Sequence, residues 1–216
     1  FDGVDINMGC PVWGVVKKGF CAGLINNFSL AREIIATAKK AADGKIPVSV
    51  KTRIGYEKVE TEKWIGFLLE RGLDAVMVHG RTAKNRSHGS ADWEEIEKAV
   101  LLRNKLRVKT AIIGNGDVKS REEAVEKCKK YGVDGVMIGR GILANPWVFS
   151  REINPLSITP RQKMELLIKH IDLFIKTYGE ERNFAVMKKF YKTYVNEFRG
   201  ASKLRDELME IKTAEK

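Results

Sequence analysis

The sequence predicts an α/β fold followed by a helical segment. Over residues 1–150, short apolar runs alternate with amphipathic stretches. The run Ala75–Val78 is apolar at every position, which is typical of a parallel strand that is covered on both faces. In the preceding stretches, residues such as Leu30, Ile34 and Ala38 recur at helical spacing. After Pro155 only the helical spacing remains, so a second part of a different class is expected there.

The alternating region contains five predicted strands: Val4–Met8, Ile46–Thr52, Ala75–His79, Thr110–Gly114 and Gly135–Gly139. The predicted helices between them are Ser29–Asp43, Thr61–Arg71, Ala91–Leu102 and Arg121–Tyr131, the last one capped by Ser120. Further along, three helices are predicted with no strand between them, over Arg161–Tyr178, Asn183–Phe198 and Ser202–Ile211.

Alternation of this kind leaves two architectures, an open doubly wound sheet or a closed (β/α)8 barrel. No Gly-x-Gly-x-x-Gly follows a strand, and polar residues end every strand, as in a barrel mouth. The sequence therefore predicts a TIM (β/α)8 barrel that lacks roughly its first three β/α units, expected before Phe1, followed by a small all-α domain. We expect the partial barrel, strands four to eight, over residues 1–153 and the helical domain over residues 154–216.

Composition restricts the class of protein. The chain has 216 residues and is 44% hydrophobic, which suits a globular core, and no apolar run is long enough to span a membrane. Three cysteines without metal-ligand spacing predict no metal site and a reducing, cytoplasmic setting. A net charge of +11 fits a polyanionic partner or, equally, a lysine-rich solvated surface.

Two consecutive strands end in glycine-containing turns, Asn115-Gly116-Asp117 and Gly139-Arg140. Glycines let backbone N–H groups approach an anion, and an arginine adds a charge-assisted pair. Such turns after the last two strands of a barrel favour a phosphate site, although tight turns with a surface arginine are the alternative.

Lys51 and His79 end two neighbouring strands. Strand alternation places Lys51 on the face opposite Val48 and Val50, where its ammonium would suit the N1–C2=O edge of a flavin. A solvated strand end is the alternative for Lys51, and a satisfied polar cap is the alternative for His79.

Cys10 lies where a strand runs into a loop, between Gly9 and Pro11. A thiol that protonates carbon has to be exposed and held by such a turn, whereas most cysteines are small buried hydrophobes. Its flanking residues make burial in a regular element less favourable. Cys21 and Cys128 are interpreted as packing residues.

The segment Asn183–Phe198 has an aromatic and apolar stripe, made of Phe184, Met187, Tyr191, Tyr194 and Phe198. The stripe predicts a hydrophobic core, and the opposite face carries Lys188, Lys189, Lys192 and Arg199. That face fits an RNA backbone or a solvated surface.

These motifs resemble the tRNA-dihydrouridine synthase family over essentially the whole chain. The similar segments are Asp5–Pro11, Val50–Gly55, Val78–Thr82, Gly114–Asp117, Ile138–Gly141, Asn145–Phe149, Met187–Phe190 and Phe198–Ala201. The resemblance implies an FMN cofactor, NADPH as the reductant and reduction of uridine to 5,6-dihydrouridine in tRNA. It implies hydride transfer to C6 of a flipped-out uridine and a proton from Cys10 to C5.

By the same resemblance, seven residues contact FMN: Lys51, His79, Asn115, Gly116, Asp117, Gly139 and Arg140. The substrate-binding residues that we expect are Asn7, Arg53, Arg81, Lys188 and Lys189. A monomer is expected to bind tRNA, and the fragment alone is expected to be inactive. Two other classes stay open, an FMN barrel that reduces a small molecule, similar to dihydroorotate or ene reductases, and a non-catalytic RNA-binding protein.

The chain departs from the family pattern close to Cys10. Many members carry a lysine four residues after the cysteine, and this chain has Gly14 there, preceded by Trp13. Lys17 and Lys18 follow and are candidates for the same contact.

Overall fold

The structure is a computed structural model that describes residues 1–153, 157–179 and 181–212. The chain forms two compact units, Phe1–Gly139 and Arg140–Lys216. The predicted domain boundary after residue 153 adjoins residues 154–156, which lie outside the described residues, whereas the two units divide between Gly139 and Arg140.

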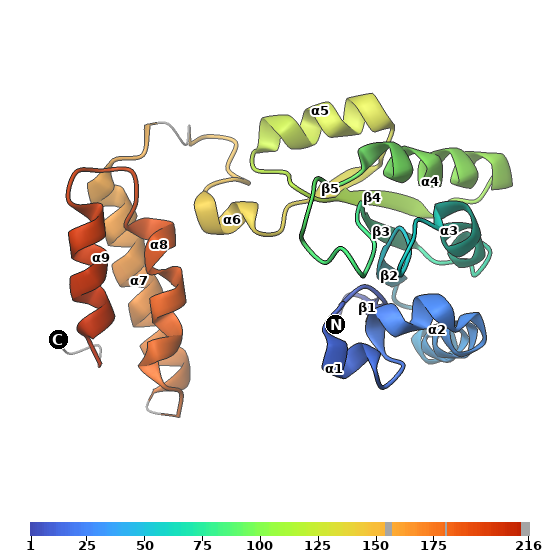
Figure 1. The fold of residues 1–216 in the computed structure, drawn as a ribbon, viewed down its shortest axis with the longest axis horizontal. Helices are drawn as coiled ribbons and strands as arrows, with labels where there is room; N and C mark the ends of the chain where they lie inside the picture. Colours follow the sequence, from blue (N-terminus) through green and yellow to red (C-terminus); the bar gives the residue numbers. More distant parts are fainter. Residues whose placement is uncertain (154–156, 180, 213–216) are drawn as a thin grey trace. The chain divides into compact units, whose positions relative to one another are not determined.

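The first unit has a parallel sheet, as predicted (Figure 1). Among the described residues it has five strands in the order of the chain: β1 (Val4–Asn7), β2 (Val48–Arg53), β3 (Ala75–His79), β4 (Ala111–Asn115) and β5 (Gly135–Met137). The predicted bounds of β3 are confirmed, and the other strands begin or end within two residues of the prediction. Each strand pairs with the next one along the chain.

Helices connect the strands, and α2 to α5 lie along one side of the sheet (Figure 1). They are α1 (Trp13–Val16), the 3-10 helix η1 (Cys21–Asn26), α2 (Phe28–Ala42), α3 (Thr61–Leu69), α4 (Trp93–Leu106) and α5 (Arg121–Tyr131). Ser120 caps α5 as predicted, because its hydroxyl accepts a hydrogen bond from Glu123 N. The predicted helix Ala91–Leu102 is wrong at both ends. The Asp92 carboxylate accepts from Glu95 N and caps α4 at its start, and α4 continues to Leu106, where Arg107 ends it in the left-handed conformation.

Strand alternation divides the sheet into two faces. Side chains such as Val50, Val76 and Ile112 are fully buried in one hydrophobic core with the residues of α2 to α4. Lys51, Met77, His79, Ile113 and Asn115 alternate with the buried residues and are only half-buried. The face opposite the helices therefore carries the polar strand ends, as the pattern around Lys51 predicts.

The second unit is helical in its described part, with α6 (Gly141–Ala144), α7 (Pro160–Tyr178), the 3-10 helix η3 (Phe184–Phe190), α8 (Tyr191–Tyr194) and α9 (Ala201–Glu210). The predicted apolar stripe is confirmed as its core: Met187, Tyr191 and Tyr194 are buried, and Phe184 and Phe198 pack against them. The predicted continuous helix over 183–198 is wrong, because the chain leaves the helix at Val195 and Glu197 has a φ of 58°. No helix of the described residues is both long and apolar enough to cross a membrane.

Candidate active site at the strand ends

The register of the sheet brings the predicted site residues of the first unit to one edge. Asn7 pairs with Lys51 across β1 and β2. Arg53, His79 and Asn115 lie at one level on β2, β3 and β4. Because the strands are parallel, their carboxyl ends meet at this edge, so residues far apart in the sequence share one site.

The loop that carries Cys10 is anchored through three consecutive carbonyl groups. The Thr52 hydroxyl donates to Met8 O (3.1 Å), Arg53 Nε donates to Gly9 O (2.7 Å), and Ala22 N donates to Cys10 O (3.2 Å). Each bond comes from a different group, so the backbone of Cys10 is fixed while its side chain stays half-exposed.

Asn7 completes this turn from within the loop. Its Oδ1 accepts hydrogen bonds from Gly9 N and Cys10 N, each at 3.0 Å. Gly9 approaches β2 closely, since an added Cβ would lie 3.2 Å from Thr52 Cα. Asn7, expected at the substrate, thus holds the Cys10 loop in this structure, and a contact with substrate stays a prediction.

Lys51 is hydrogen-bonded to the end of β4. Its Nζ donates to Asn115 Oδ1 (3.1 Å), and Asn115 Nδ2 donates to Met137 O on β5 (2.8 Å). Burial, and next the nearby guanidinium of Arg53, lower the pKa of Lys51. Lys51 thus places a cation at the polar edge. Among the described hydrogen bonds, its ammonium has one partner, the amide oxygen of Asn115.

His79 lies beside a buried arginine. Arg81 Nη1 is 3.2 Å from His79 Nε2, and an arginine can only donate, so Nε2 is the acceptor and the proton of the neutral ring is on Nδ1. Burial first, then the cations Arg53, Lys51 and Arg81, lower the pKa of His79 to about 3. His79 is therefore a neutral ring that presents an Nδ1–H donor.

Arg81 is only 4% exposed, and its guanidinium donates hydrogen bonds to other groups of the protein. Nη2 donates to Asp117 Oδ2 (2.6 Å) and to Gly89 O, and Nε donates to Gly89 O (3.1 Å). The same Asp117 oxygen accepts from Ala91 N (2.8 Å). Arg81 and Asp117, expected at substrate and FMN, hold the segment 88–91 against the strand ends in this structure, and their ligand contacts stay predictions.

Arg53 is buried in a similar way, with 8% exposure. Besides Gly9 O, its Nη1 donates to Thr82 O (3.1 Å) and Arg86 O (2.7 Å). Burial, and next the charge of Arg81, lower the pKa of Arg53. Arg53 thus connects the Cys10 loop with the loop after β3, and its expected contact with substrate stays a prediction.

The turn after β4 needs its glycine. Gly116 has a φ of 138°, and an added Cβ would overlap Ala91 Cβ and lie 3.3 Å from His79 Cδ2. Its carbonyl accepts a hydrogen bond from Trp93 Nε1 (3.1 Å). The glycine therefore permits the close approach of Ala91 to this turn beside His79.

The remaining predicted residues lie at or beyond the junction of the two units. Gly139 ends the first unit and Arg140 begins the second, and both are exposed. In the second unit, Lys188 Nζ donates to Met209 O at the end of α9, and Lys189 Nζ is 4.8 Å from the centre of the Phe190 ring. The phosphate and tRNA roles of these residues stay predictions.

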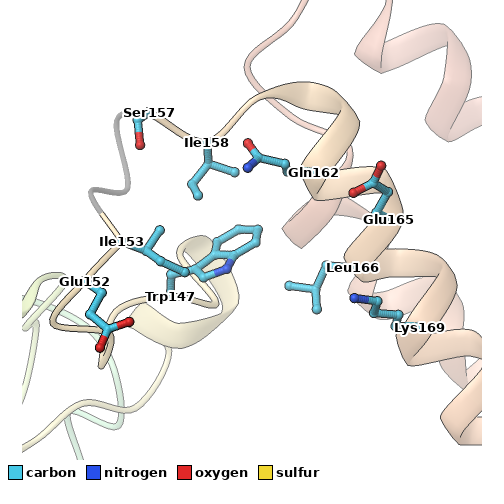
Figure 2. Close-up of a pocket in the computed structure, with 9 residues that line it drawn as sticks. All are labelled: Trp147, Glu152, Ile153, Ser157, Ile158, Gln162, Glu165, Leu166 and Lys169. Atoms are coloured by element: carbon cyan, nitrogen blue, oxygen red, sulfur yellow. The ribbon is translucent and has the colours of Figure 1, made fainter.

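A separate pocket of about 450 Å³ lies within the second unit (Figure 2). Trp147 faces the first turns of α7 across it, where Leu166 and Lys169 are found. Glu152 and Glu165 also line it, so its charge is mixed. None of the residues that we expect at FMN or substrate lines this pocket.

Several supporting residues are absent from the sequence prediction. Thr52 is fully buried and also accepts a hydrogen bond from Trp64 Nε1 (2.8 Å), which ties the Cys10 loop to α3. Cys21, interpreted from the sequence as a packing residue, has a φ of 50°, and its pKa is raised first by burial and second by the nearby Cys10. In the sequence, only Gly9 indicates the contact between the Cys10 loop and β2, because a glycine permits the close approach of the loop to Thr52.

The fold and this edge define the class of protein: an α/β protein with a polar, cation-rich site at the carboxyl ends of parallel strands. Enzymes with parallel α/β barrels hold their ligands at this end of the strands. A model of the family described as "Dihydrouridine synthase (Dus)" matches residues 1–216. The chain belongs to the dihydrouridine synthase family.

Curated relatives agree with this assignment. The "Probable tRNA-dihydrouridine synthase" of Staphylococcus aureus is 43% identical over 211 residues, which cover 97% of this chain and 63% of the relative. The "Probable tRNA-dihydrouridine synthase 2" of Bacillus subtilis is 39% identical over 217 residues, which cover 100% of this chain and 65% of the relative. The chain thus spans slightly less than two thirds of the length of these relatives.

Among solved structures, a 2,3-dimethylmalate lyase is 12% identical with a TM-score of 0.42, over 69% of this chain and 62% of that protein. This likeness is too remote to inform function.

Proposed function

We propose that this chain is the active-site portion of an FMN-dependent tRNA-dihydrouridine synthase, which reduces uridine in tRNA with NADPH as the electron source. The observation that carries the proposal is the anchoring of Cys10 at the same strand edge as Lys51, His79 and Asn115. Family membership and the names of the relatives support the same reaction.

The architecture that we propose around this site is a (β/α)8 barrel, of which the described sheet forms five consecutive strands. The strands follow in chain order, and α2 to α5 lie on one side of the sheet. A doubly wound sheet reverses its strand order and carries helices on both faces. The half-polar face around Lys51 and His79 then corresponds to the barrel interior.

The residues at the strand ends fit a flavin by the chemistry of their donors. Lys51 offers a cation for the N1–C2=O edge, and His79 offers a neutral Nδ1–H. Gly116 packs closely against Ala91 in the turn after β4, and its backbone borders His79. Bound and reduced FMN would supply the hydride for C6 of the uracil ring. We further propose that Asn115, Asp117, Gly139 and Arg140 complete this site.

The protein's own contribution to the chemistry is a positioned proton. Cys10 would donate its thiol proton to C5 of uridine, and the resulting thiolate would be reprotonated before the next turnover. The three carbonyl anchors of its loop keep the thiol in one place, which is what general acid catalysis requires. Lys51 and Arg53 place positive charge at the same strand edge as the Cys10 loop.

Transfer RNA is the proposed partner. The net charge of +11 favours a polyanion, and the second unit exposes Lys189 and Lys192. The target base has to leave its stack to reach the strand-end site, and extrusion of a single base is how enzymes act on nucleobases.

The proposed function is tested by mapping dihydrouridine in tRNA by sequencing after deletion of the full-length gene. At least one position is expected to lose dihydrouridine and to regain it when the gene is restored. Unchanged dihydrouridine at every position, in a strain without a second family member, would falsify the proposal. Tight, salt-sensitive binding of tRNA is expected for a tRNA-dihydrouridine synthase and is not expected for an enzyme that reduces a small molecule.

A further inference from the structure

The loop that follows Cys10 exposes large apolar side chains on a short stretch of chain. Val12, Trp13 and Phe20 are 57%, 65% and 53% exposed. We call these three residues, together with Lys17 and Lys18, the Trp13 surface. An exposed tryptophan this close to a reactive residue is unusual for a soluble protein and points to a binding role.

The Trp13 surface is cationic as well as aromatic. Lys17 Nζ lies 4.8 Å from the centre of the Trp13 ring, and Lys18 is exposed next to it. The chain carries no acidic residue between Asp5 and Glu33. A flat aromatic ring beside positive charge is the combination that holds a nucleobase and its phosphates.

The backbone beneath this surface is firmly held. Lys17 N donates to Trp13 O (2.8 Å), Gly19 N donates to Val16 O (2.9 Å), and Ala22 N donates to Cys10 O (3.2 Å). Val16 packs against the main hydrophobic core together with the buried residues of η1, such as Ala22 and Leu24. The backbone that carries Trp13 is therefore ordered, so little backbone freedom is lost when a ligand stacks on the ring.

The position of Trp13 suits a nucleotide next to the target base. Trp13 follows Cys10 by three residues, and three residues span at most about 11 Å. An extruded base leaves neighbours that have lost a stacking partner, and an aromatic side chain can replace that partner.

We propose that Trp13 stacks on a nucleobase that flanks the reduced uridine, while Lys17 and Lys18 contact the adjacent phosphates. The inference rests on the proposed function and identifies the part of the chain that holds the substrate beside Cys10. Stacking of this kind tolerates any base, so the Trp13 surface adds affinity and orientation rather than sequence preference.

The test uses the full-length protein and tRNA transcribed in vitro, which carries no modification. Binding is measured over a series of salt concentrations. Trp13→Ala is expected to weaken binding roughly tenfold or more, and Trp13→Phe is expected to retain most of the affinity. Replacing Lys17 and Lys18 by alanine is expected to lower the slope of log K against log[salt] by about 0.7 to 0.9 for each lysine.

The matched control is Lys109→Ala, which removes an exposed lysine just before β4, at the opposite end of the strands from Cys10. It is expected to leave both affinity and salt slope near those of the wild type. Uridine reduction gives a second readout, since Trp13→Ala should raise KM for tRNA more than it lowers kcat.

Two results would overturn the inference. One is binding by Trp13→Ala within twofold of the wild type. The other is a lower unfolding temperature of Trp13→Ala with unchanged tRNA affinity, because Trp13 would then be covered by another part of the full-length protein. A wild-type protein that neither binds tRNA nor reduces uridine removes the proposed function together with this inference, whereas an active wild type with an unaffected Trp13→Ala removes the inference alone.

Discussion

His79 shows how the surroundings of a single side chain fix its protonation state and tautomer. Burial and the cations Arg53, Lys51 and Arg81 hold its pKa at about 3, against 6.5 for a free histidine. The hydrogen bond from Arg81 to Nε2 also selects the Nδ1–H form. Neutral histidine in one tautomer is a defined hydrogen-bond donor near neutral pH.

The first prediction concerns Arg81→Ala. The substitution removes one of the three cations, so the pKa of His79 is expected to rise while burial, Lys51 and Arg53 still hold it below 6.5. It also frees Nε2, so the ring is expected to populate both neutral tautomers. Long-range ¹H–¹⁵N spectra of ¹⁵N-histidine-labelled full-length protein measure both effects, with His88→Gln and His170→Gln to assign the other two rings of this chain.

A wild-type His79 that takes up its proton near pH 6.5 would contradict this account.

The lowered pKa of His79 also predicts how the stability of the fold changes with pH. Below pH 6.5 the unfolded chain binds a proton that folded His79 does not, so the stabilisation is complete above pH 6.5 and is lost as the pH falls toward about 3.

The roles of single residues could be predicted only in part. A glycine before Cys10 and a proline after it indicate a turn, and the structure has that turn. The sequence cannot show that Arg53 and Arg81 direct their donors to backbone carbonyls of their own protein. An arginine at a strand end has the same sequence pattern whether it meets a ligand or a loop, because the difference lies in tertiary burial.

Gly114 controls the contact between β4 and α4. An added Cβ would lie 2.5 Å from Trp93 Cζ3 and 2.8 Å from Cη2, and the Trp93 ring is held by its hydrogen bond to Gly116 O. The indole therefore cannot move aside without losing this bond. The contact links the core of the sheet with the turn that borders His79.

The second prediction is a pair of glycine substitutions. Gly114→Ala is expected to lower the free energy of unfolding by about 1–3 kcal/mol through overpacking. Gly66→Ala, in the interior of α3 with open space around it, is expected to raise it by up to about 1 kcal/mol. Thermal or denaturant unfolding of the full-length protein measures both, and equal effects of the two changes would rule out the role of Trp93.

At the level of elements, the predicted and observed helices and strands agree best where the local sequence pattern is strongest. Ser120 caps α5 and the apolar run Ala75–His79 forms β3, as their sequences indicate. The segment 183–198 has helical periodicity throughout, yet it becomes a 3-10 helix and one helical turn. Asn196 Nδ2 donates to Lys192 O and Thr193 O and ends the helix, which an apolar stripe alone cannot reveal.

At the scale of the whole molecule, the site is an outcome of strand register. Asn7, Lys51, His79 and Asn115 are spread over more than half of the chain, and parallel pairing brings them to one edge. The location of this edge could be predicted, because the ends of consecutive parallel strands converge. The arrangement of the second unit relative to this edge has no comparable signal in the sequence, so the roles of Lys188 and Lys189 depend on experiment.

The most direct test of the account is uridine reduction by purified full-length Cys10→Ala beside the wild type, with unmodified tRNA and NADPH. The account predicts a rate about 10²- to 10⁴-fold lower for Cys10→Ala, as expected when a general acid is removed, with the flavin spectrum and tRNA affinity unchanged. Cys21→Ala, which removes the neighbouring thiol, is expected to stay active. Reduction by Cys10→Ala at the wild-type rate, with flavin bound, would contradict the central claim that Cys10 supplies the proton.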